Sequence, residues 1–272
     1  FAPNLSLRMD NHIHFKREDM QSVFSFKLRG AYNKIAHLTA AQLKRGVICA
    51  SAGNHAQGVA LSAKRVGCKA VIVMPTTTPP VKIDAVRSHG GEAVEIVLHG
   101  ESYTDAYGHA LELEKKRKLT FVHPFDDPDV IAGQGTIAVE ILRQWRNVDY
   151  VFVAVGGGGL IAGVAAYLGE IAPHVKVIGV ESCESACLKL AFETGERAIL
   201  PQVGLFADGV AVAQIGALPF DVVRLPKSDG SGQIVDPDIV TCSTDEICAA
   251  IKDVYEDNRT IVEPAGALAI AG

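Results

Sequence analysis

The sequence predicts an α/β fold in which mostly parallel strands are covered by helices on both faces. Short strands such as 151–155 are apolar at every position, and glycine-rich turns and alanine-rich helices follow them. A strand that is apolar on both sides is typical of a parallel sheet buried on both faces. Strands that alternate with helices along the chain indicate the α/β class.

Each predicted element has a local reason. The strand 47–50 runs into the turn S-A-G-N, and the strand 70–74 ends at Pro75. Apolar residues at helical spacing predict helices over 81–88 and 103–118, with a strand over 92–98 between them and T-F-V-H-P as a short strand after them. The second half alternates in the same way: helix 136–144, strand 150–155, helix 160–172, strand 175–180. Residues 224–238 are rich in Gly, Ser, Pro and Asp, so we expect a surface loop there.

Composition and charge exclude several classes of protein. The 272 residues suffice for one large domain or two ordinary ones. A net charge of -5 argues against a nucleic-acid binder, which would carry a basic face. No apolar run reaches the length of a membrane span. The six cysteines form no C-x-x-C pair, which gives little support to a zinc site. We expect them to be free thiols of a protein in a reducing compartment. We see no signal peptide, expect both ends of the chain to be trimmed, and expect a cytoplasmic or plastid-stromal location.

Lys27 has an unusual setting in V-F-S-F-K-L-R-G, residues 23–30. Lysine is rarely buried without a partner, and desolvation lowers the pKa of its amine. That is how enzymes prepare a lysine to form a Schiff base. The alternative is that the side chain extends to solvent from a half-buried helix start. These residues alone leave both interpretations open.

Four consecutive glycines, Gly156 to Gly159, lie between a predicted strand and a predicted helix that starts at Leu160. Their free backbone N–H groups and the helix N-terminus suit a phosphate, which side chains would keep away. The segment G-G-G-L-I-A also fits the dinucleotide pattern, with Glu181 where a ribose-binding acid belongs. A nicotinamide-dependent oxidoreductase therefore remains an alternative at this point.

A second loop, S-A-G-N-H-A-Q-G at residues 51–58, also follows a strand and opens a helix. The N–H groups of Gly53, Asn54 and His55 would suit an anion smaller than a phosphate, such as a substrate carboxylate. A reactive lysine, a phosphate loop and a carboxylate loop together fit pyridoxal 5'-phosphate acting on an amino acid. A dehydrogenase would leave Lys27 and the second loop unexplained.

The motifs S-F-K-L-R-G-A, S-A-G-N-H-A-Q-G, G-Q-G-T, V-G-G-G-G-L, F-A-D-G-V-A-V and E-P-A-G-A follow one another in this order. Over nearly its whole length the chain resembles the catalytic domain of the threonine deaminases (threonine dehydratases). These belong to the tryptophan synthase β-like, fold type II group of pyridoxal phosphate enzymes. The resemblance implies two open twisted, mostly parallel sheets flanked by helices, with the cofactor in the interdomain cleft.

The resemblance also implies roles for single residues. Lys27 would form the Schiff base with the cofactor, and Phe26 would lie against it. The remaining cofactor contacts would be Asn54 to the 3-hydroxyl, Gly156, Gly157, Gly158, Gly159 and Leu160 to the phosphate, and Glu263 near the ring. The substrate would be surrounded by Ser51, Ala52, Gly53, Asn54, His55 and Phe125.

The implied reaction is the β-elimination of L-threonine to 2-oxobutanoate and ammonia, the first step towards isoleucine. Lys27 would take the Cα proton as general base, and the cofactor phosphate would protonate the leaving hydroxyl. L-serine should react less well, because a pocket discriminates one methyl group by only about 1–3 kcal/mol. In members of this family the partner of the pyridine nitrogen is a serine in an S-G-A-N motif, which is not among these 272 residues.

Two related activities are alternatives, serine dehydratase and serine racemase. A racemase of this family would carry a proton-transferring serine at position 52, where this chain has Ala52. The residues after Glu181, S-C-E-S-A-C, do not offer the metal ligands of a racemase, so we expect no metal. A core fragment that binds the cofactor weakly without turnover is a non-enzyme alternative.

We further predict a large cofactor domain formed by residues 1–46 and 128–272. A small α/β domain, residues 47–127, would be inserted in it. We expect a homo-oligomer, either a dimer or a tetramer.

Overall fold

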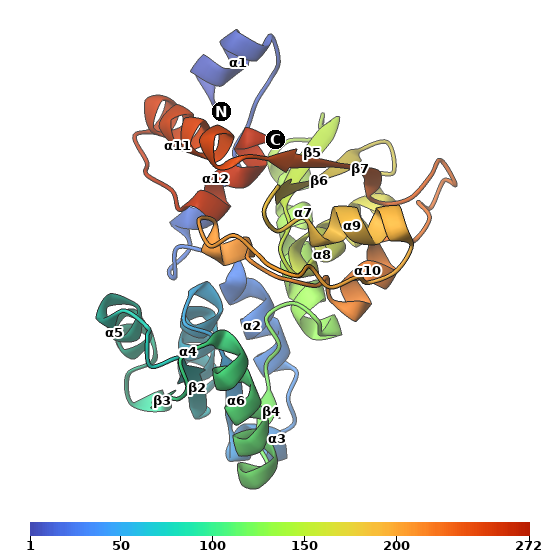
Figure 1. Ribbon diagram of the computed structural model, residues 1–272. Coiled ribbons are helices and arrows are strands. Elements are labelled where there is room, and N and C mark those ends of the chain that lie inside the picture. Colours follow the sequence, from blue (N-terminus) through green and yellow to red (C-terminus); the bar gives the residue numbers. More distant parts are fainter. The chain divides into compact units, whose positions relative to one another are not determined.

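The computed structural model describes residues 1–272 and contains two compact units (Figure 1). We call Glu18–Gln134 the lysine unit, and Phe1–Arg17 with Gly135–Gly272 the glycine-loop unit. The helix α7 (Pro128–Gln144) belongs to both, since the division falls within it. No helix is both long enough and apolar enough to cross a membrane.

The lysine unit is built on a four-stranded sheet in the order β3-β2-β1-β4. Every pair of neighbouring strands in it is parallel. The strands are β1 (Val47–Ala50), β2 (Ala70–Met74), β3 (Val94–Leu98) and β4 (Thr120–Phe121). The bounds of β1 and β2 are the predicted ones. Proline has no N–H to give to a sheet, and β2 ends immediately before Pro75.

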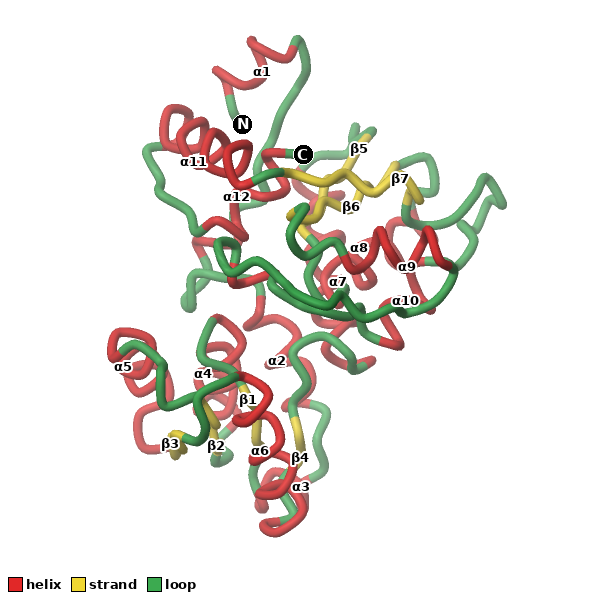
Figure 2. Tube along the Cα trace, in the orientation of Figure 1, coloured by secondary structure: helices red, strands yellow, loops and turns green.

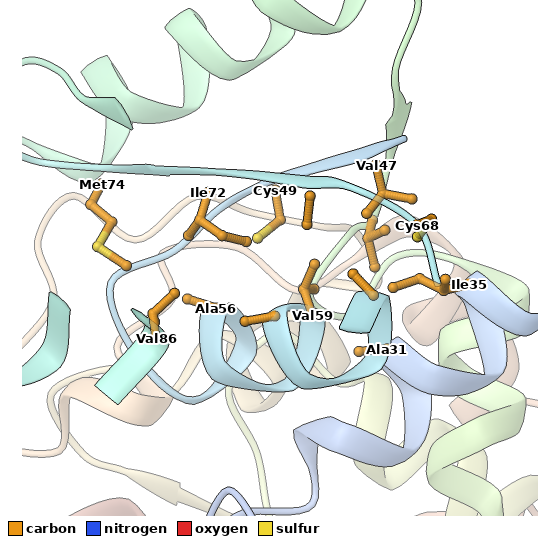
Figure 3. Close-up of a cluster of buried hydrophobic side chains, with 14 residues drawn as sticks. Ala31, Ile35, Val47, Cys49, Ala56, Val59, Cys68, Ile72, Met74 and Val86 are labelled. Carbon is orange, nitrogen blue, oxygen red and sulfur yellow. The ribbon is translucent and has the colours of Figure 1, made fainter. Parts of the chain in front are cut away.

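Helices cover both faces of this sheet because successive side chains of a strand point to opposite faces. One face carries α4 (Asn54–Val66) and α5 (Pro80–Gly90), and the other carries α6 (Tyr103–Arg117). Figure 3 shows the first core, in which β1 and β2 side chains meet α4 and its neighbours: Val47, Cys49, Ile72 and Met74 with Ala56, Val59 and Ile35. The unit is completed by α2 (Lys27–Ala36), α3 (Ala40–Arg45) and single 3-10 turns at Glu18–Met20 and Gly91–Ala93.

The glycine-loop unit contains a three-stranded sheet in the order β5-β6-β7, again parallel throughout. Its strands are β5 (Tyr150–Ala154), β6 (Lys176–Ser182) and β7 (Asp236–Cys242). Its helices are α1 (Pro3–Met9), α8 (Gly159–Ile171), α9 (Cys187–Thr194), α10 (Ala217–Val223), α11 (Thr244–Asn258) and α12 (Pro264–Ala271). Between α9 and α10 the chain is mostly loop (Figure 2), apart from the 3-10 turn η3 (Asp208–Val210).

The predicted fold class is confirmed: both sheets are parallel and flanked by helices. One helix was predicted too short, since α7 starts at Pro128 rather than near residue 136. The glycines of G-Q-G resemble helix breakers, but they lie inside the helix. A Cβ at Gly133 would stand 2.7 Å from the carbonyl oxygen of Arg29, so this glycine allows close packing of α2 on α7.

The predicted loop over 224–238 is exposed along residues 228–233, but the prediction is wrong at its end, because the strand β7 begins at Asp236. The predicted inserted domain, residues 47–127, lies wholly within the lysine unit, which is longer at both ends. The division into domains remains a prediction.

Candidate active site

Lys27 is the first residue of α2, and its side chain is half-buried. Its Nζ atom donates a hydrogen bond to the carbonyl oxygen of Pro124 at 3.1 Å and lies 5.2 Å from the centroid of the Phe26 ring. Ser25 Oγ accepts the backbone N–H of Lys27 at 3.2 Å, which holds the first turn of the helix. The amine is therefore held at a defined place by the lysine unit, as a reactive lysine requires.

The helix α4 comes unusually close to the backbone of Lys27. A Cβ at Gly58 would lie 3.1 Å from both the carbonyl carbon and the carbonyl oxygen of Lys27. A side chain at this position would be tighter than ordinary van der Waals contact and would displace the backbone of Lys27 by a few tenths of an ångström. The motif S-A-G-N-H-A-Q-G thus fixes the lysine through its last glycine, a role that sequence reasoning missed.

The loop before α4 has the form of an anion site. Asn54 begins the helix after Gly53 as N-cap, and no side chain caps it. Ser51 Oγ instead accepts the N–H of Gly53 at 3.2 Å. A Cβ at Gly53 would meet no atom within 4 Å, so there is open space in front of the loop. Ser51, Ala52, Gly53 and Asn54 are all half-buried. Backbone N–H groups at a helix start with open space before them suit a carboxylate.

His55 is more deeply buried than the residues before it in the loop, since only 3% of it is exposed. Its Nε2 atom lies 2.8 Å from the carbonyl oxygen of Val122. A carbonyl can only accept, so Nε2 carries the proton. Burial, and secondly the positive charge of Lys27, lower the pKa of His55 to about 3. The imidazole is neutral, so only the backbone N–H of His55 remains for a substrate anion.

The segment from Val122 to Asp126 completes this half of the site. His123 Nδ1 accepts the N–H of Asp126 at 2.7 Å and that of Phe125 at 3.3 Å. Its ring lies edge-on to the ring of Phe125, with 4.7 Å between the two ring centroids. Burial lowers the pKa of His123. The side chain of Phe125 is half-buried. The motif V-H-P-F-D thereby provides both the acceptor for the Lys27 amine and an oriented aromatic ring.

The glycine loop belongs to the other unit and joins β5 to α8. Gly158 is the N-cap of α8 with a φ of 87°, a conformation that favours glycine. A Cβ there would stand 2.4 Å from Ile215 Cδ1, and one at Gly156 would stand 3.0 Å from Val210 Cα. Gly157 accepts the N–H of Gly216 at 3.1 Å. Packing within the chain therefore favours glycine at positions 156 and 158. From the sequence, these glycines were explained only by the close approach of a ligand.

The remaining predicted residues are in the same unit as the glycine loop. Leu160 lies in the first turn of α8 and is half-buried. Glu263 is exposed and directly precedes α12, which its side chain does not cap. Its Oε1 atom would lie 3.5 Å from a Cβ at Gly209 of η3. The structure therefore groups Leu160, Glu263 and the four glycines in one unit, and Phe26, Lys27, Ser51 to His55 and Phe125 in the other.

Glu181, the acid on which the dinucleotide interpretation depended, is fully buried. Its two carboxylate oxygens accept the N–H groups of Leu188 and Lys189, each at 2.8 Å. A ribose could not reach it without unfolding this region. The geometry thus disfavours the nicotinamide alternative.

A family model described as pyridoxal-phosphate dependent enzyme matches residues 1–272. The biosynthetic L-threonine dehydratase of Burkholderia multivorans is 59% identical over 100% of this chain and 52% of its own length. The chloroplastic biosynthetic threonine dehydratase of Arabidopsis thaliana is 53% identical, over 100% of this chain and 44% of its own. The chain thus spans about half the length of these curated relatives.

Two solved structures are similar along nearly the whole chain. The processed form of threonine deaminase isoform 2 from Solanum lycopersicum has a TM-score of 0.92 and 51% identity, covering 100% of this chain and 76% of that one. Maize serine racemase has a TM-score of 0.91 and 32% identity, covering 99% and 78%.

Proposed function

Because this chain belongs to the pyridoxal-phosphate dependent enzyme family, we propose that it carries out the dehydration and deamination of L-threonine to 2-oxobutanoate and ammonia. The threonine dehydratases among its relatives support this reaction over others of the family. Their description as biosynthetic supports a place in isoleucine biosynthesis. The observation that carries the proposal is the Lys27 amine, held at the carbonyl of Pro124 beside the S-A-G-N-H loop in one compact unit.

The residues present fit the cofactor. The N–H groups at the start of α8 suit its phosphate, and the half-buried amine of Lys27 suits its aldehyde. We assign Phe26 to the face of the ring, Asn54 to its 3-hydroxyl group and Glu263 to its surroundings. When bound, pyridoxal phosphate supplies an aldehyde that captures the substrate amine and a ring that withdraws electrons from the α-carbon.

We assign the catalytic and substrate-binding roles to separate groups of the chain. Lys27 Nζ takes the proton from the substrate α-carbon, as a general base on a rigid helix start. The N–H groups of Gly53, Asn54 and His55 hold the carboxylate in the open space in front of Gly53. Ala52 has no proton to transfer to the opposite side of the α-carbon, which disfavours racemisation. The ring of Phe125, oriented by His123, contacts the substrate methyl group.

The test is an assay of 2-oxo acid release with L-threonine and with L-serine, on the chain supplied with pyridoxal phosphate. We expect threonine to have the higher kcat/KM, by roughly 10- to 200-fold, because one methyl group is worth no more. Lys27→Ala, with the same supply of cofactor, should release no 2-oxo acid. D-serine formed from L-serine would instead favour the racemase alternative. A wild-type chain that binds the cofactor and releases no 2-oxo acid from either substrate would refute the proposal.

We infer a homo-oligomer and a cytoplasmic or plastid-stromal location, the latter supported by a chloroplastic relative. A sedimentation measurement of the purified chain tests the first. A mass of one chain at the concentrations used in the assay would contradict it.

A further inference from the structure

The buried carboxylate of Glu181 has no part in the chemistry described above. It lies at the end of β6, and its exposed fraction is 0%. Burying a carboxylate is costly unless hydrogen bonds compensate it. Here Oε1 accepts the N–H of Leu188 and Oε2 accepts that of Lys189, the second and third residues of α9. No side chain of α9 itself caps this helix, so Glu181 fixes its first turn from the neighbouring strand.

Cys187 is the first residue of α9 and is completely buried. Its Sγ atom lies 3.4 Å from the carbonyl oxygen of Gly156, the first glycine of the glycine loop. The carbonyl can only accept, so the thiol donates. Burial raises the pKa of Cys187, and the charge of Glu181 and a hydrogen bond to its side chain raise it further, so the sulfur stays protonated and its proton is shared between Glu181 and Gly156.

A separate segment, Val210–Gly216, also contacts the glycine loop. Val210 packs on Gly156, Ile215 packs on Gly158, and the N–H of Gly216 binds the carbonyl of Gly157. Cys187 therefore supplies a second support, and the two sets of contacts together restrict the direction of the loop's N–H groups. Groups that bind an anion do so best when their direction is fixed before binding.

We propose that Glu181 and Cys187 are positioning residues for phosphate binding: Glu181 fixes the start of α9, and Cys187 then fixes the peptide of Gly156. This inference rests on the proposed assignment of the cofactor phosphate to the glycine loop. It gives the buried acid and thiol a role in cofactor affinity, although neither touches the cofactor.

The experiment compares two probes, pyridoxal phosphate and pyridoxal, which lacks the phosphate. Each is titrated into the cofactor-free chain and followed by the visible absorption of the Lys27 adduct. The readout is the ratio of the two dissociation constants. Cys187→Ala should lower the preference for pyridoxal phosphate by about three- to tenfold, the worth of one hydrogen bond, and leave pyridoxal binding unchanged. Cys187→Ser keeps a donor and should retain most of the preference.

Glu181→Gln provides an independent variant should Cys187→Ala fail to fold. Each carboxylate oxygen accepts one N–H group of α9, and glutamine replaces one of these oxygens by an NH2 group that can only donate, so we expect a loss of the same order. Cys68→Ala is the matched control: it also removes a buried thiol, but in the lysine unit, and should leave the ratio unchanged.

The outcomes separate the two proposals. A wild-type chain that binds both probes equally would refute the phosphate assignment itself. A wild-type chain that prefers pyridoxal phosphate, with that preference intact in Cys187→Ala and in Glu181→Gln, would overturn the positioning role alone.

Discussion

His55 makes the stability of the chain depend on pH in a way that one substitution can isolate. The imidazole is buried, donates from Nε2 to Val122, and has Lys27 and His123 as its charged or titratable neighbours. Both neighbours oppose a positive charge on His55, and burial opposes it more strongly. In the unfolded chain the same histidine takes up a proton near its ordinary pKa of 6.5.

Acid lowers the free energy of unfolding, because His55 binds a proton more readily in the unfolded chain than in the folded chain. Between about pH 6.5 and about pH 3 the unfolded chain binds a proton that the folded chain refuses, so acid favours unfolding. The contribution of the neutral, buried His55 to the free energy of unfolding is fully present above pH 6.5, the pKa of this histidine in the unfolded chain. It is lost as the pH falls towards about 3. At pH 5.5 the loss from this one group is about 1.4 kcal/mol, and at pH 7.5 it is below about 0.1 kcal/mol. The value at pH 5.5 depends only on a folded pKa well below 5.5.

The assay is urea unfolding of the cofactor-free chain at both pH values, for the wild type and for His55→Gln. Glutamine can place an amide donor near the position of Nε2 and does not titrate. Other histidines contribute equally to both proteins, so the wild type should lose about 1.4 kcal/mol more than the variant between pH 7.5 and pH 5.5. Equal losses in the two proteins would mean that the folded chain protonates His55 as readily as the unfolded chain does, which would contradict the lowered pKa of the buried imidazole.

Two further predictions concern the backbone. Gly133→Ala places a Cβ 2.7 Å from the carbonyl oxygen of Arg29 and should lower the free energy of unfolding by about 1–3 kcal/mol. At Gly108, in α6, an added Cβ would meet no atom within 4 Å, so Gly108→Ala should raise the free energy of unfolding by up to about 1 kcal/mol. Urea unfolding that shows a gain for both variants, or a loss for both, would contradict these two predictions. Phe24 has a φ of 55° and is 73% exposed, so Phe24→Gly should relieve strain at no loss of packing. We expect a gain of about 0.5–1 kcal/mol, and a lower urea midpoint would show that the ring stabilises the turn before Lys27.

Local sequence patterns were sufficient for the class of fold and for most of the strands, but not for β7, whose first residues fall in the predicted loop 224–238. The runs at 47–50 and 70–74 are apolar on both faces, and the structure places β1 and β2 at these bounds. The start of α7 was missed because Gly133 and Gly135 are weak helix formers, and only tertiary packing explains them. Local propensity carries no information on which helix a glycine will contact.

The candidate site was predictable as a set of motifs but not as a set of contacts. Lys27 and Pro124 are 97 positions apart, and no local pattern pairs an amine with that carbonyl. The contact of the His55 side chain was not predictable, because its partner, the carbonyl of Val122, is 67 positions away. The function of the Glu181 side chain was likewise hidden, since its partners are backbone N–H groups of a later helix. The assigned roles in binding cofactor and substrate remain predictions.

A peptide map of the chain after borohydride reduction in the presence of pyridoxal phosphate shows directly which lysine holds the cofactor. The matched internal control is Lys34, in the same helix and paired with Asp127 at 2.8 Å and Asp129 at 3.1 Å. We predict one pyridoxyl group per chain, on Lys27, with Lys34 unmodified. An unmodified Lys27, or label spread over the surface lysines, would contradict the assignment of Lys27 as the residue that holds the cofactor.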